Sequence, residues 1–444
     1  MKNSMENIIS LAKRRGFIYP GSELYGGLSG TWDYGPLGVE LKNNIKQEWW
    51  RRFVRARSDV YGVDSAILMS SRVWEASGHV GNFSDPMIDC RKCKSRFRAD
   101  ALDIAKGCPQ CGAKDFTDAR PFNMMFKTNA GPVEDTASAV YLRPETAQGM
   151  FVNFKNVVDS FHPKLPFGIA QMGKAFRNEI TPGNFIFRSR EFEQMEIEYF
   201  VKEAEWERHF ATWQSAMEEW LSFVGLAGKY SLREVPEGDR AHYSKRTIDI
   251  DFDFPFGREE LYGLAYRTDF DLLNHSKASG HDLWYLDEET QEKIVPHVIE
   301  PTFGVDRTVL AVLVNAYAEE EVPSGDGAAS DGRARDVRTV LKLPARLAPY
   351  TVAVFPLVQN KEQIAGRARE VYGLLKEWVA ATWDGIGNIG KRYRRQDEIG
   401  TPWCVTVDYQ SLEDDTVTIR DRDTMKQERL AVAELLGYIE KHIS

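Results

Sequence analysis

The pattern of hydrophobic and polar positions predicts two different architectures along the chain. Beyond residue 345, apolar runs at 347–358 and 401–409 alternate with helically spaced apolar residues at 361–378 and 426–439. Apolar runs of this length are typical of strands, and apolar residues at this spacing are typical of helices. Strand and helix in alternation predict a small α/β domain with a mainly parallel sheet at 346–444.

Residues 1–345 instead show short strands, hairpins and scattered turns. They predict an α+β domain in which helices flank a mostly antiparallel sheet, so the whole chain belongs to the mixed α/β class. Helical spacing occurs at 41–54, 203–224 and 309–317, and a short amphipathic helix is expected at 8–12. Residues 203–224 carry a stripe of mostly aromatic residues at helical spacing: Trp206, Phe210, Trp213, Met217 and Trp220. Such a stripe is more typical of core packing than of a cofactor site.

Three further stretches interrupt this pattern. Residues 319–332 are acidic, then small, and nearly without large apolar residues, so we interpret them as a linker or mobile loop. Insertions into the first domain are expected at about 88–115, and, in helical form, at about 203–245.

Residues 175–200 predict a hairpin with an unusual polar face. If both arms are strands, Arg177 and Glu179 share one face. On the other arm Phe192, Gln194 and Glu196 share a face, whereas Met195, Ile197 and Tyr199 lie on the opposite one. Arginine suits a phosphate, phenylalanine a flat base, and carboxylate and amide oxygens suit N–H donors, so the pattern favours a ligand site. The alternative, a solvated hairpin with cross-strand salt bridges, does not explain a phenylalanine among the charges.

Four cysteines form two Cys-x-x-Cys pairs, Cys90 with Cys93 and Cys108 with Cys111. This spacing is typical of a tetrahedral zinc site, and four protein ligands leave no open position, which favours a structural role. Two disulfides or four free thiols are the alternatives. The fifth cysteine, Cys404, lies in an apolar strand and is expected in the core.

Charge and composition favour a globular protein of the cytoplasm. The net charge is −9, 43% of residues are hydrophobic, and no stretch approaches the ~20 apolar residues of a membrane span. The first residues lack the continuous apolar core of a secretory signal. Basic residues cluster locally, as Lys391, Arg392, Arg394 and Arg395 around Tyr393, and as Arg333, Arg335, Arg338, Lys342 and Arg346. Such clusters suit nucleic acid, but each cluster alone is more typical of a solvated surface.

Five ordered motifs resemble one family. FRNE with FRSREFEQME (176–179 and 187–196) is similar to the second signature motif of class II aminoacyl-tRNA synthetases, and EFEQMEIEYF resembles the homodimeric type of glycyl-tRNA synthetase. WDYGPLGVELKNNI (32–45) and VIEPTFGVDR (298–307) resemble the first and third motifs. YLRPETAQGMF (141–151) resembles the amino-acid-binding loop, and 388–408 the anticodon-binding domain. The resemblance implies a homodimer in which 1–345 is catalytic and 346–444 binds the anticodon of tRNA(Gly).

The resemblance also implies roles in activating glycine with ATP. Arg177, Glu179 and Arg307 are the expected catalytic residues: Arg177 meets the α-phosphate, Glu179 the adenine amino group, and Arg307 the outer phosphate, while Phe192 stacks on the base. Such activation needs alignment and charge neutralisation, not a covalent nucleophile. The implied ATP-binding set is Arg177, Asn178, Glu179, Phe187, Arg188, Ser189, Arg190, Glu191, Phe192, Glu260, Leu261, Gly304, Val305, Asp306 and Arg307. Glu260 and Glu300 are candidate Mg²⁺ ligands.

Glycine itself offers only an ammonium and a carboxylate. Glu145, Glu196 and Glu300 are expected around the ammonium, and Arg98 is a candidate partner for the carboxylate. The implied glycine-binding set is Arg98, Glu145, Phe192, Glu193, Gln194, Met195, Glu196, Glu300, Pro301, Thr302, Phe303 and Gly304. Thr302 stands where the family commonly has serine. No histidine is assigned a catalytic role. A class II synthetase for another amino acid, or an inactive synthetase-like tRNA-binding protein, remain the alternatives.

Overall fold

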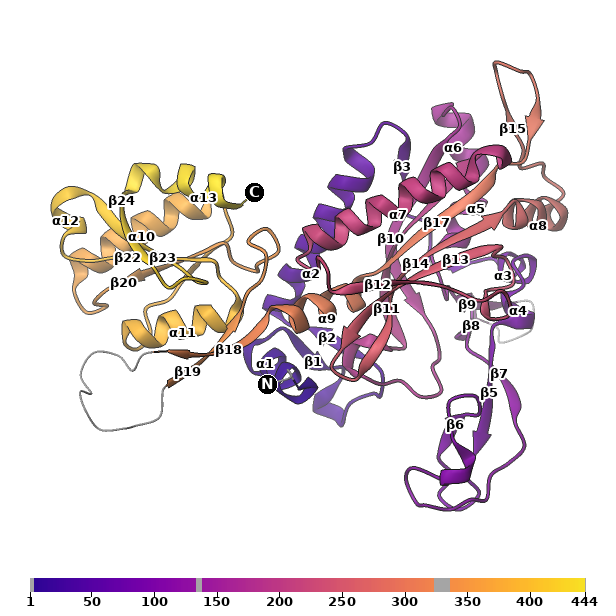
Figure 1. Ribbon diagram of the computed structural model, residues 1–444, viewed down its shortest axis with the longest axis horizontal. Coiled ribbons are helices and arrows are strands. Elements are labelled where there is room, and N and C mark those ends of the chain that lie inside the picture. Colours follow the sequence, from indigo (N-terminus) through magenta and orange to yellow (C-terminus); the bar gives the residue numbers. More distant parts are fainter. Residues whose placement is uncertain (1–3, 133–137, 323–335, 444) are drawn as a thin grey trace.

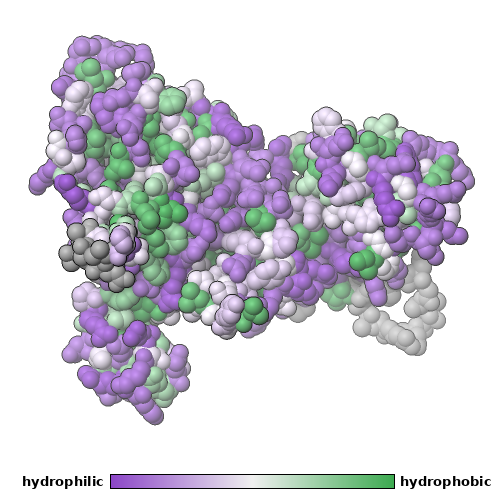
Figure 2. All heavy atoms as spheres, turned by 180° about the vertical axis from the view of Figure 1, so that it is seen from behind, coloured by the Kyte–Doolittle hydropathy of each residue, from purple (hydrophilic) through white to green (hydrophobic). Residues whose placement is uncertain are grey.

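The computed structural model describes residues 4–132, 138–322 and 336–443 and places them in two bodies that lie side by side (Figure 1). The larger body is built on a seven-stranded sheet and the smaller, yellow body on a five-stranded one. Figure 2 shows hydrophobic side chains on one outer face in small groups separated by hydrophilic ones. Within the described ranges, none of the helices combines the length and apolarity that a membrane crossing requires.

The seven-stranded sheet is almost entirely antiparallel. In spatial order its strands are β12 (Tyr230–Glu234), β13 (Arg246–Phe254), β14 (Gly257–Thr268), β17 (His297–Gly304), β11 (Glu191–Val201), β10 (Phe167–Phe176) and β3 (Val60–Gly62). The edge strand β3 is parallel to β10, and the other pairs are antiparallel. The antiparallel sheet expected from the sequence is therefore confirmed. The stretch expected as a helical insertion also contributes the edge strand β12.

One face of this sheet is buried under helices. Its core is shared with α1 (Met5–Arg15), α2 (Pro36–Trp50), its π-helical continuation Arg51–Arg55, α7 (Trp206–Phe223) and α9 (Val305–Ala316). Met195 and Ile197 of β11 and Phe303 of β17 point into this core, as the period of two along a strand predicts. On α7 the side chains of Trp213 and Trp220 are also buried there, which confirms that the aromatic stripe is core.

The opposite face is covered only in part. At one end α5 (Ala147–Val152), α6 (Phe154–Phe161) and α8 (Phe270–Ser279) pack against Phe167, Phe200 and Val298. The middle of β11, β14 and β17 stays open on this face. This uncovered stretch of sheet forms the floor of the pocket described below.

Smaller elements surround the large sheet. They are β1 (Ile18–Pro20) with β2 (Trp32–Tyr34), β4 (Leu68–Met69) with β9 (Ala139–Leu142) and β8 (Lys127–Asn129), α3 (Ser71–Ala76), α4 (His79–Asn82), and β15 (Tyr285–Leu286) with β16 (Lys293–Ile294). A separate three-stranded sheet, β6 (Arg96–Arg98), β5 (Ser84–Asp89) and β7 (Arg120–Asn123), forms a lobe that projects from the larger body (Figure 1).

The smaller body has three layers. Its sheet runs β21 (Ala381–Trp383), β20 (Val352–Pro356), β22 (Trp403–Val407), β23 (Thr416–Asp421) and β24 (Gln427–Ala431). Helices α10 (Glu362–Lys376) and α13 (Leu435–Ile443) cover one face and α11 (Ile389–Ile399) the other, with the short α12 (Ser411–Asp414) at the side. Cys404 is buried in this core, as expected.

The expectation of a mainly parallel sheet here is only half right. The pairs of β20 with β21 and with β22 are parallel, but β22, β23 and β24 pair antiparallel. The stretch 426–439, expected as one helix, begins as β24. A turn closed by the Asp421 carboxylate, which accepts from the backbone N–H of Thr424 at 2.7 Å, folds this segment back into a hairpin.

The stretch interpreted as a linker also carries regular structure. Residues 319–322 belong to β18 (Tyr317–Val322), which pairs with β19 (Asp336–Leu341) in a hairpin between the two bodies. The remainder of the expected linker, residues 323–332, lies outside the described residues, as do Arg333 and Arg335 of the second basic cluster.

Candidate active site

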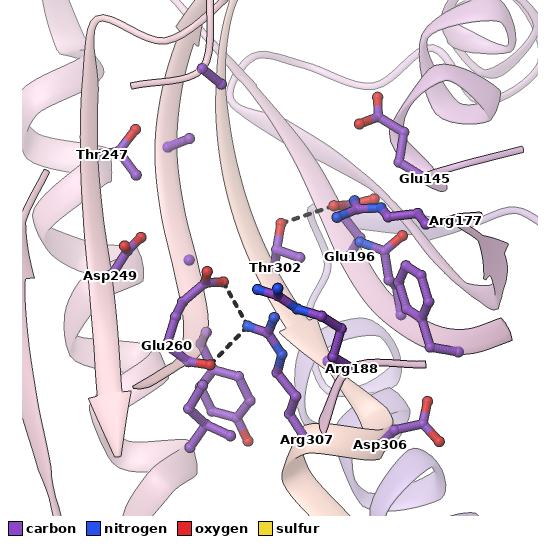
Figure 3. A pocket seen from close by; sticks show the side chains of 18 of the residues that line it. Glu145, Arg177, Arg188, Glu196, Thr247, Asp249, Glu260, Thr302, Asp306 and Arg307 are labelled. Carbon is purple, nitrogen blue, oxygen red and sulfur yellow. Dashed lines mark hydrogen bonds and ion pairs between the residues drawn. The ribbon is translucent and has the colours of Figure 1, made fainter. Parts of the chain in front are cut away.

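A pocket of about 470 Å³ opens on the uncovered face of the large sheet, over β11, β14 and β17 (Figure 3). Small residues on β14 leave the room for it: Gly263 pairs with Thr302 and Ala265 with Glu300 of β17. A Cβ atom added at Gly263 would meet no other atom within 4 Å. Side chains from the β10–β11 loop form one wall, and residues of β13 and of the segment between β12 and β13 form another.

The predicted hairpin is present, but its first arm is shorter than expected. β10 ends at Phe176 and β11 begins at Glu191, so Arg177 and Glu179 lie in a loop and not on a strand. The chain turns locally because the backbone N–H of Glu179 donates to the carbonyl oxygen of Arg177 at 2.7 Å. The Arg190 guanidinium donates to the carbonyl oxygen of Glu179 at 3.2 Å and holds this turn in place. Both Arg177 and Glu179 still line the pocket.

Aromatic rings and arginines gather at one end of the pocket, the arginine-rich end. The Arg177 guanidinium lies 5.2 Å from the Phe192 ring centroid and 5.3 Å from that of Phe83, and its Nε donates to the carbonyl oxygen of Pro144 at 3.0 Å. The buried carboxylate of Glu179 has one oxygen without a hydrogen-bond partner among the described residues. This end therefore offers a flat ring, a fixed cation and a carboxylate acceptor.

Two further arginines line the same pocket. Arg307 stacks over the Phe187 ring at 4.4 Å, and its Nη1 donates to the carbonyl oxygen of Glu260 at 2.8 Å. The same nitrogen lies 3.2 Å from the Glu260 carboxylate. Arg188 extends toward Arg307 (Figure 3). The arrangement suits a chain of phosphates because it presents positive charge along one wall.

Several residues of the implied sets have side chains with partners outside the pocket, although Glu193, Leu261 and Asp306 are still among the residues that line it. Glu193 forms ion pairs with Lys42, at 3.0 Å, and Lys46 of α2. Asp306 accepts from the Tyr34 hydroxyl and from the backbone N–H of Glu193. The side chains of Met195, Leu261, Phe303 and Val305 belong to the helix-side core, and Glu191 pairs with Lys174 at the exposed rim. The strand period explains most of these cases, since neighbours of a pocket-facing residue face the helices.

Carboxylates gather at the other end of the pocket, the acidic end. Glu196 accepts from the Thr302 hydroxyl at 2.9 Å and from the Thr146 hydroxyl. Glu145 and Glu300 line the same end. Arg98 also lines the pocket, and it pairs with Asp85 at 2.9 Å and Asp100 at 2.6 Å. A substrate carboxylate would have to share Arg98 with these two acids.

A buried polar chain that the sequence did not predict connects the carboxylates. Gln148 donates to Glu145 at 3.0 Å and to Asp271 at 2.9 Å. Asp271 accepts two hydrogen bonds from Arg267, at 2.8 and 2.9 Å, and Arg267 also pairs with Glu300. No motif marks this chain, because its members come from β14, β17, α5 and α8.

A further buried acid, Glu198, lies beside this chain. Oxygens of Glu196, Glu198 and Glu300 lie within 4.8 Å of one another. Glu198 continues the period-two series Phe192, Gln194, Glu196, so extending that series by one step would have found it.

The acidic end holds more carboxyl groups than cationic groups. Burial, together with the charge of Glu145, raises the pKa of Glu196; burial and the charge of Glu300 raise that of Glu198. Burial raises the pKa of Glu300 to about 8, against the opposing charge of Arg267. A small cation entering here would relieve this repulsion, and an ammonium group is such a cation.

The two candidate Mg²⁺ ligands are far apart. Glu300 pairs with Ala265 across the sheet, whereas Glu260 lies five positions earlier on β14 and pairs with Arg307. At about 3.3 Å per residue, this spacing separates their positions along the strand by roughly 16 Å. One ion cannot bridge them, and Glu300 is engaged by Arg267. Asp249 lies near Glu260, and burial with the charge of Glu260 raises the pKa of Asp249 to about 6.

The four paired cysteines come together in the projecting lobe. The sulfurs of Cys90 and Cys111 are 3.6 Å apart and those of Cys93 and Cys108 are 3.5 Å apart. Tetrahedral zinc with Zn–S bonds of about 2.3 Å sets its sulfurs about 3.8 Å apart. The residues therefore fit the ion, and the four free thiols are not linked as disulfides.

The basic clusters are only partly available to a ligand. Arg392 is buried and donates to carbonyl oxygens of Pro356, Gly385 and Gly387, and Arg395 makes two hydrogen bonds to Asp384. Arg338 is also buried. Lys391 is exposed on α11, and Arg394, which also interacts with a neighbour, is half-buried. Because successive positions on a helix face different sides, some basic residues of α11 face the solvent and others face the core.

Comparison with known proteins agrees with this geometry. The tRNA synthetase class II core domain (G, H, P, S and T) matches residues 126–316, and an anticodon binding domain matches residues 351–442. The chain is 50% identical to the glycine–tRNA ligase of Geobacillus thermodenitrificans (strain NG80-2), covering 100% of this chain and 98% of that protein. It is 51% identical to the glycine–tRNA ligase of Alkaliphilus oremlandii (strain OhILAs), covering 100% and 99%. With an arginine-lined and an acid-lined end in one pocket and full-length similarity of this order, the chain belongs to the glycine–tRNA ligase family of class II aminoacyl-tRNA synthetases.

Proposed function

We propose that the pocket activates glycine with ATP and that the product, glycyl-adenylate, then esterifies the 3′ end of tRNA(Gly). The observation that supports this most directly is the division of one pocket into an arginine-rich end, with Arg177, Arg188 and Arg307, and an acidic end, with Glu145, Glu196 and Glu300. A substrate that spans both ends carries phosphates on one side and a cation on the other.

In the first step a carboxylate oxygen of glycine attacks the α-phosphorus of ATP, and pyrophosphate leaves with the electron pair of the broken P–O bond. Arg177 would neutralise the charge that develops on the α-phosphate, while Phe192 holds the adenine ring. Arg307 and Arg188 would bind the departing phosphates. In the second step a ribose hydroxyl of the tRNA attacks the glycyl carbonyl carbon, and AMP leaves.

Magnesium would accompany ATP in this reaction. Glu260, beside Arg307 and Asp249 at the arginine-rich end, is the carboxylate of this chain that fits the role. The ion would neutralise phosphate charge.

Glycine would be selected by charge and by lack of space. Its ammonium would enter among the carboxyl groups of Glu145, Glu196 and Glu300. Thr302 hydrogen-bonds Glu196 at 2.9 Å, so its hydroxyl fixes that carboxylate while its methyl group narrows the site. A side chain on the α-carbon would clash, and such exclusion discriminates more strongly than a missing contact.

The test is pyrophosphate exchange with each amino acid supplied separately. We expect exchange with glycine and rates lower by at least about two orders of magnitude with alanine, serine, proline or threonine. Faster exchange with one of the others would favour a synthetase for that amino acid. Exchange with none would favour a tRNA-binding protein without activity.

We propose a structural zinc ion in the projecting lobe, bound by Cys90, Cys93, Cys108 and Cys111. Freshly purified protein should contain about one zinc per chain, because four thiolates at this spacing satisfy the ion completely. Replacing Cys108 with serine should release the ion and open residues 84–123 to limited proteolysis. Because the nucleotide-binding side chains belong to other elements, ATP affinity should persist; a zinc content well below one per chain would contradict the assignment.

We propose that α11 contributes to tRNA binding through Lys391 and Arg394. Replacing both with glutamate should weaken tRNA charging. It should also reduce the salt dependence of tRNA binding, because a protein that makes fewer phosphate contacts releases fewer counterions when it binds. Glycine-dependent pyrophosphate exchange should stay unchanged. The matched control is Lys376→Glu on α10, on the opposite face of the small sheet. Normal charging by the double variant across a range of salt would show that tRNA binds elsewhere.

We also propose a two-fold homodimer in the cytoplasm, with the catalytic unit at 1–345 and the anticodon-binding unit at 346–444. The support is family membership and the similarity of residues 32–45 to the motif at which class II subunits meet. A two-fold interface uses the same patch on both subunits. Sedimentation of the active protein measures the assembly directly.

A further inference from the structure

His79 is a buried histidine beside the acidic end, and the mechanism above does not use it. It opens the short helix α4, and its side chain is 4% exposed. Its ring packs edge-on against Trp74 at 5.5 Å and lies 5.5 Å from Phe83. This aromatic cage gives the ring a fixed position.

Both ring nitrogens of His79 have partners. Nε2 lies 3.3 Å from the Oε2 atom of Glu145, and Nδ1 lies 2.8 Å from the hydroxyl oxygen of Ser77, a residue 1% exposed. The second oxygen of Glu145 accepts from Gln148 at 3.0 Å. The Glu145 carboxylate is thus held from two sides, and its remaining lone pairs are left for a ligand.

We propose that His79, oriented by Ser77, is a positioning residue for glycine: it fixes the Glu145 carboxylate, in its ionised form, where the substrate ammonium binds. The inference rests on the proposed activation of glycine and adds a residue that does not itself touch the substrate. It resembles the way a buried acid orients a catalytic histidine, with the roles of the two groups exchanged.

His79 also acts on the pKa of Glu145. Burial acts to raise the pKa of Glu145, but the charge and hydrogen bond of His79, followed by the charge of Arg267, outweigh it and hold that pKa below its ordinary value. The other groups that face Glu145 from β11, β17, α8 and the loop before β13 are Glu196, Glu300, Asp271, His275 and Tyr243. Three of these are acids, so without His79 Glu145 would tend to take up a proton.

The test compares His79→Asn with His79→Gln. The amide nitrogen of glutamine takes the place of Nε2 and still reaches Glu145, whereas that of asparagine takes the place of Nδ1 and does not. In pyrophosphate exchange we expect the asparagine variant to raise the KM for glycine about ten- to a hundred-fold, the loss typical of a charge-assisted hydrogen bond. The glutamine variant should recover most of this loss, and the KM for ATP should change little in either.

The pH profile gives a second readout. In the asparagine variant the KM for glycine should rise more steeply toward low pH than in the wild-type enzyme, because Glu145 has lost the contact with His79 that helps to hold its pKa below the ordinary value. In the wild-type enzyme Glu145 should contribute little to this rise, since its carboxylate stays ionised. His209→Asn on α7, where His209 lies near Glu205, is the matched control and should alter neither KM.

The outcomes separate the inference from the function beneath it. If both variants raise the KM for glycine equally, with no change in pH profile, or if both leave it unchanged, His79 only fills space and the inference is overturned. If the wild-type enzyme shows no glycine-dependent exchange, the proposed function fails first. Ser77→Ala, which keeps the imidazole, should raise the KM for glycine by a smaller factor, and an unchanged value would remove Ser77 from the proposal.

Discussion

Replacing Arg177 with alanine is expected to lower glycine-dependent pyrophosphate exchange by two to three orders of magnitude. A charge-assisted contact to a developing charge is worth about 2.7–4 kcal/mol. The guanidinium is fixed by Phe83, Phe192 and the carbonyl oxygen of Pro144, so it needs no rearrangement to meet the α-phosphate. The loss should appear in kcat, since the contact strengthens as the pentavalent phosphorus forms.

The affinity for tRNA should stay nearly the same in this variant. Arg208→Ala is a suitable control, because the Arg208 side chain is 68% exposed on α7, on the helix side of the sheet. A near-normal exchange rate for Arg177→Ala would remove this residue from the phosphate site. An equal loss of tRNA affinity would instead point to a disturbed fold.

Replacing Arg267 with methionine is expected to lower the free energy of unfolding by about 3–5 kcal/mol at neutral pH, the usual effect of removing one partner of a buried ion pair. Its side chain is 1% exposed and pairs with both Asp271 and Glu300. Without it, these two acids and their neighbours Glu196 and Glu198 lose their shared cation. Denaturant unfolding measures the change, and Arg208→Met is the exposed control.

The deficit of this variant should shrink as the pH falls. The pKa of Glu300 is raised to about 8, above its ordinary value. At pH values between these two pKa values, Glu300 therefore binds a proton more readily in the folded state than in the unfolded chain. Stability from this group is therefore fully present at low pH and decreases as the pH rises toward 8. Removing Arg267 raises the pKa of Glu300 further and steepens this decrease. A deficit independent of pH between 5 and 8 would show that packing, not charge, dominates at this position.

A strand was predictable from the sequence where polar and apolar residues alternate along that strand alone. On β11 the alternation of Gln194 and Glu196 with Met195 and Ile197 placed pocket side and core side correctly before any tertiary contact was known. The spacing of the cysteines predicted that the four thiols come together, because each Cys-x-x-Cys pair is local in the sequence. The end of β10 at Phe176 was not predictable, since it depends on the guanidinium of Arg190 holding the backbone at Glu179.

Side-chain partners across the fold were the part that sequence could not supply. Arg98 and Glu193 look like free charges in the chain, but one is taken by Asp85 and Asp100 and the other by Lys42 and Lys46. The chain from Glu145 through Gln148 to Arg267 draws on elements more than a hundred residues apart. Spacing rules describe neighbours on one helix or strand, so they do not reach such assemblies.

The buried Arg338 of β19 joins the hairpin that lies between the two bodies to the smaller body. It donates to Asp397 of α11 at 3.1 Å, to the carbonyl oxygen of Arg422 at 2.9 Å, and to Glu320 of β18 at 2.8 Å. Arg422 in turn donates to the carbonyl oxygen of Leu343 at 2.9 Å. A fragment beginning at residue 346 would lack Arg338 and Leu343, leaving Asp397 with Arg420 and the Arg422 guanidinium short of an acceptor. The hydrophobic pattern changes near residue 346. Because of these contacts, the chain can not be cut there into independently stable pieces.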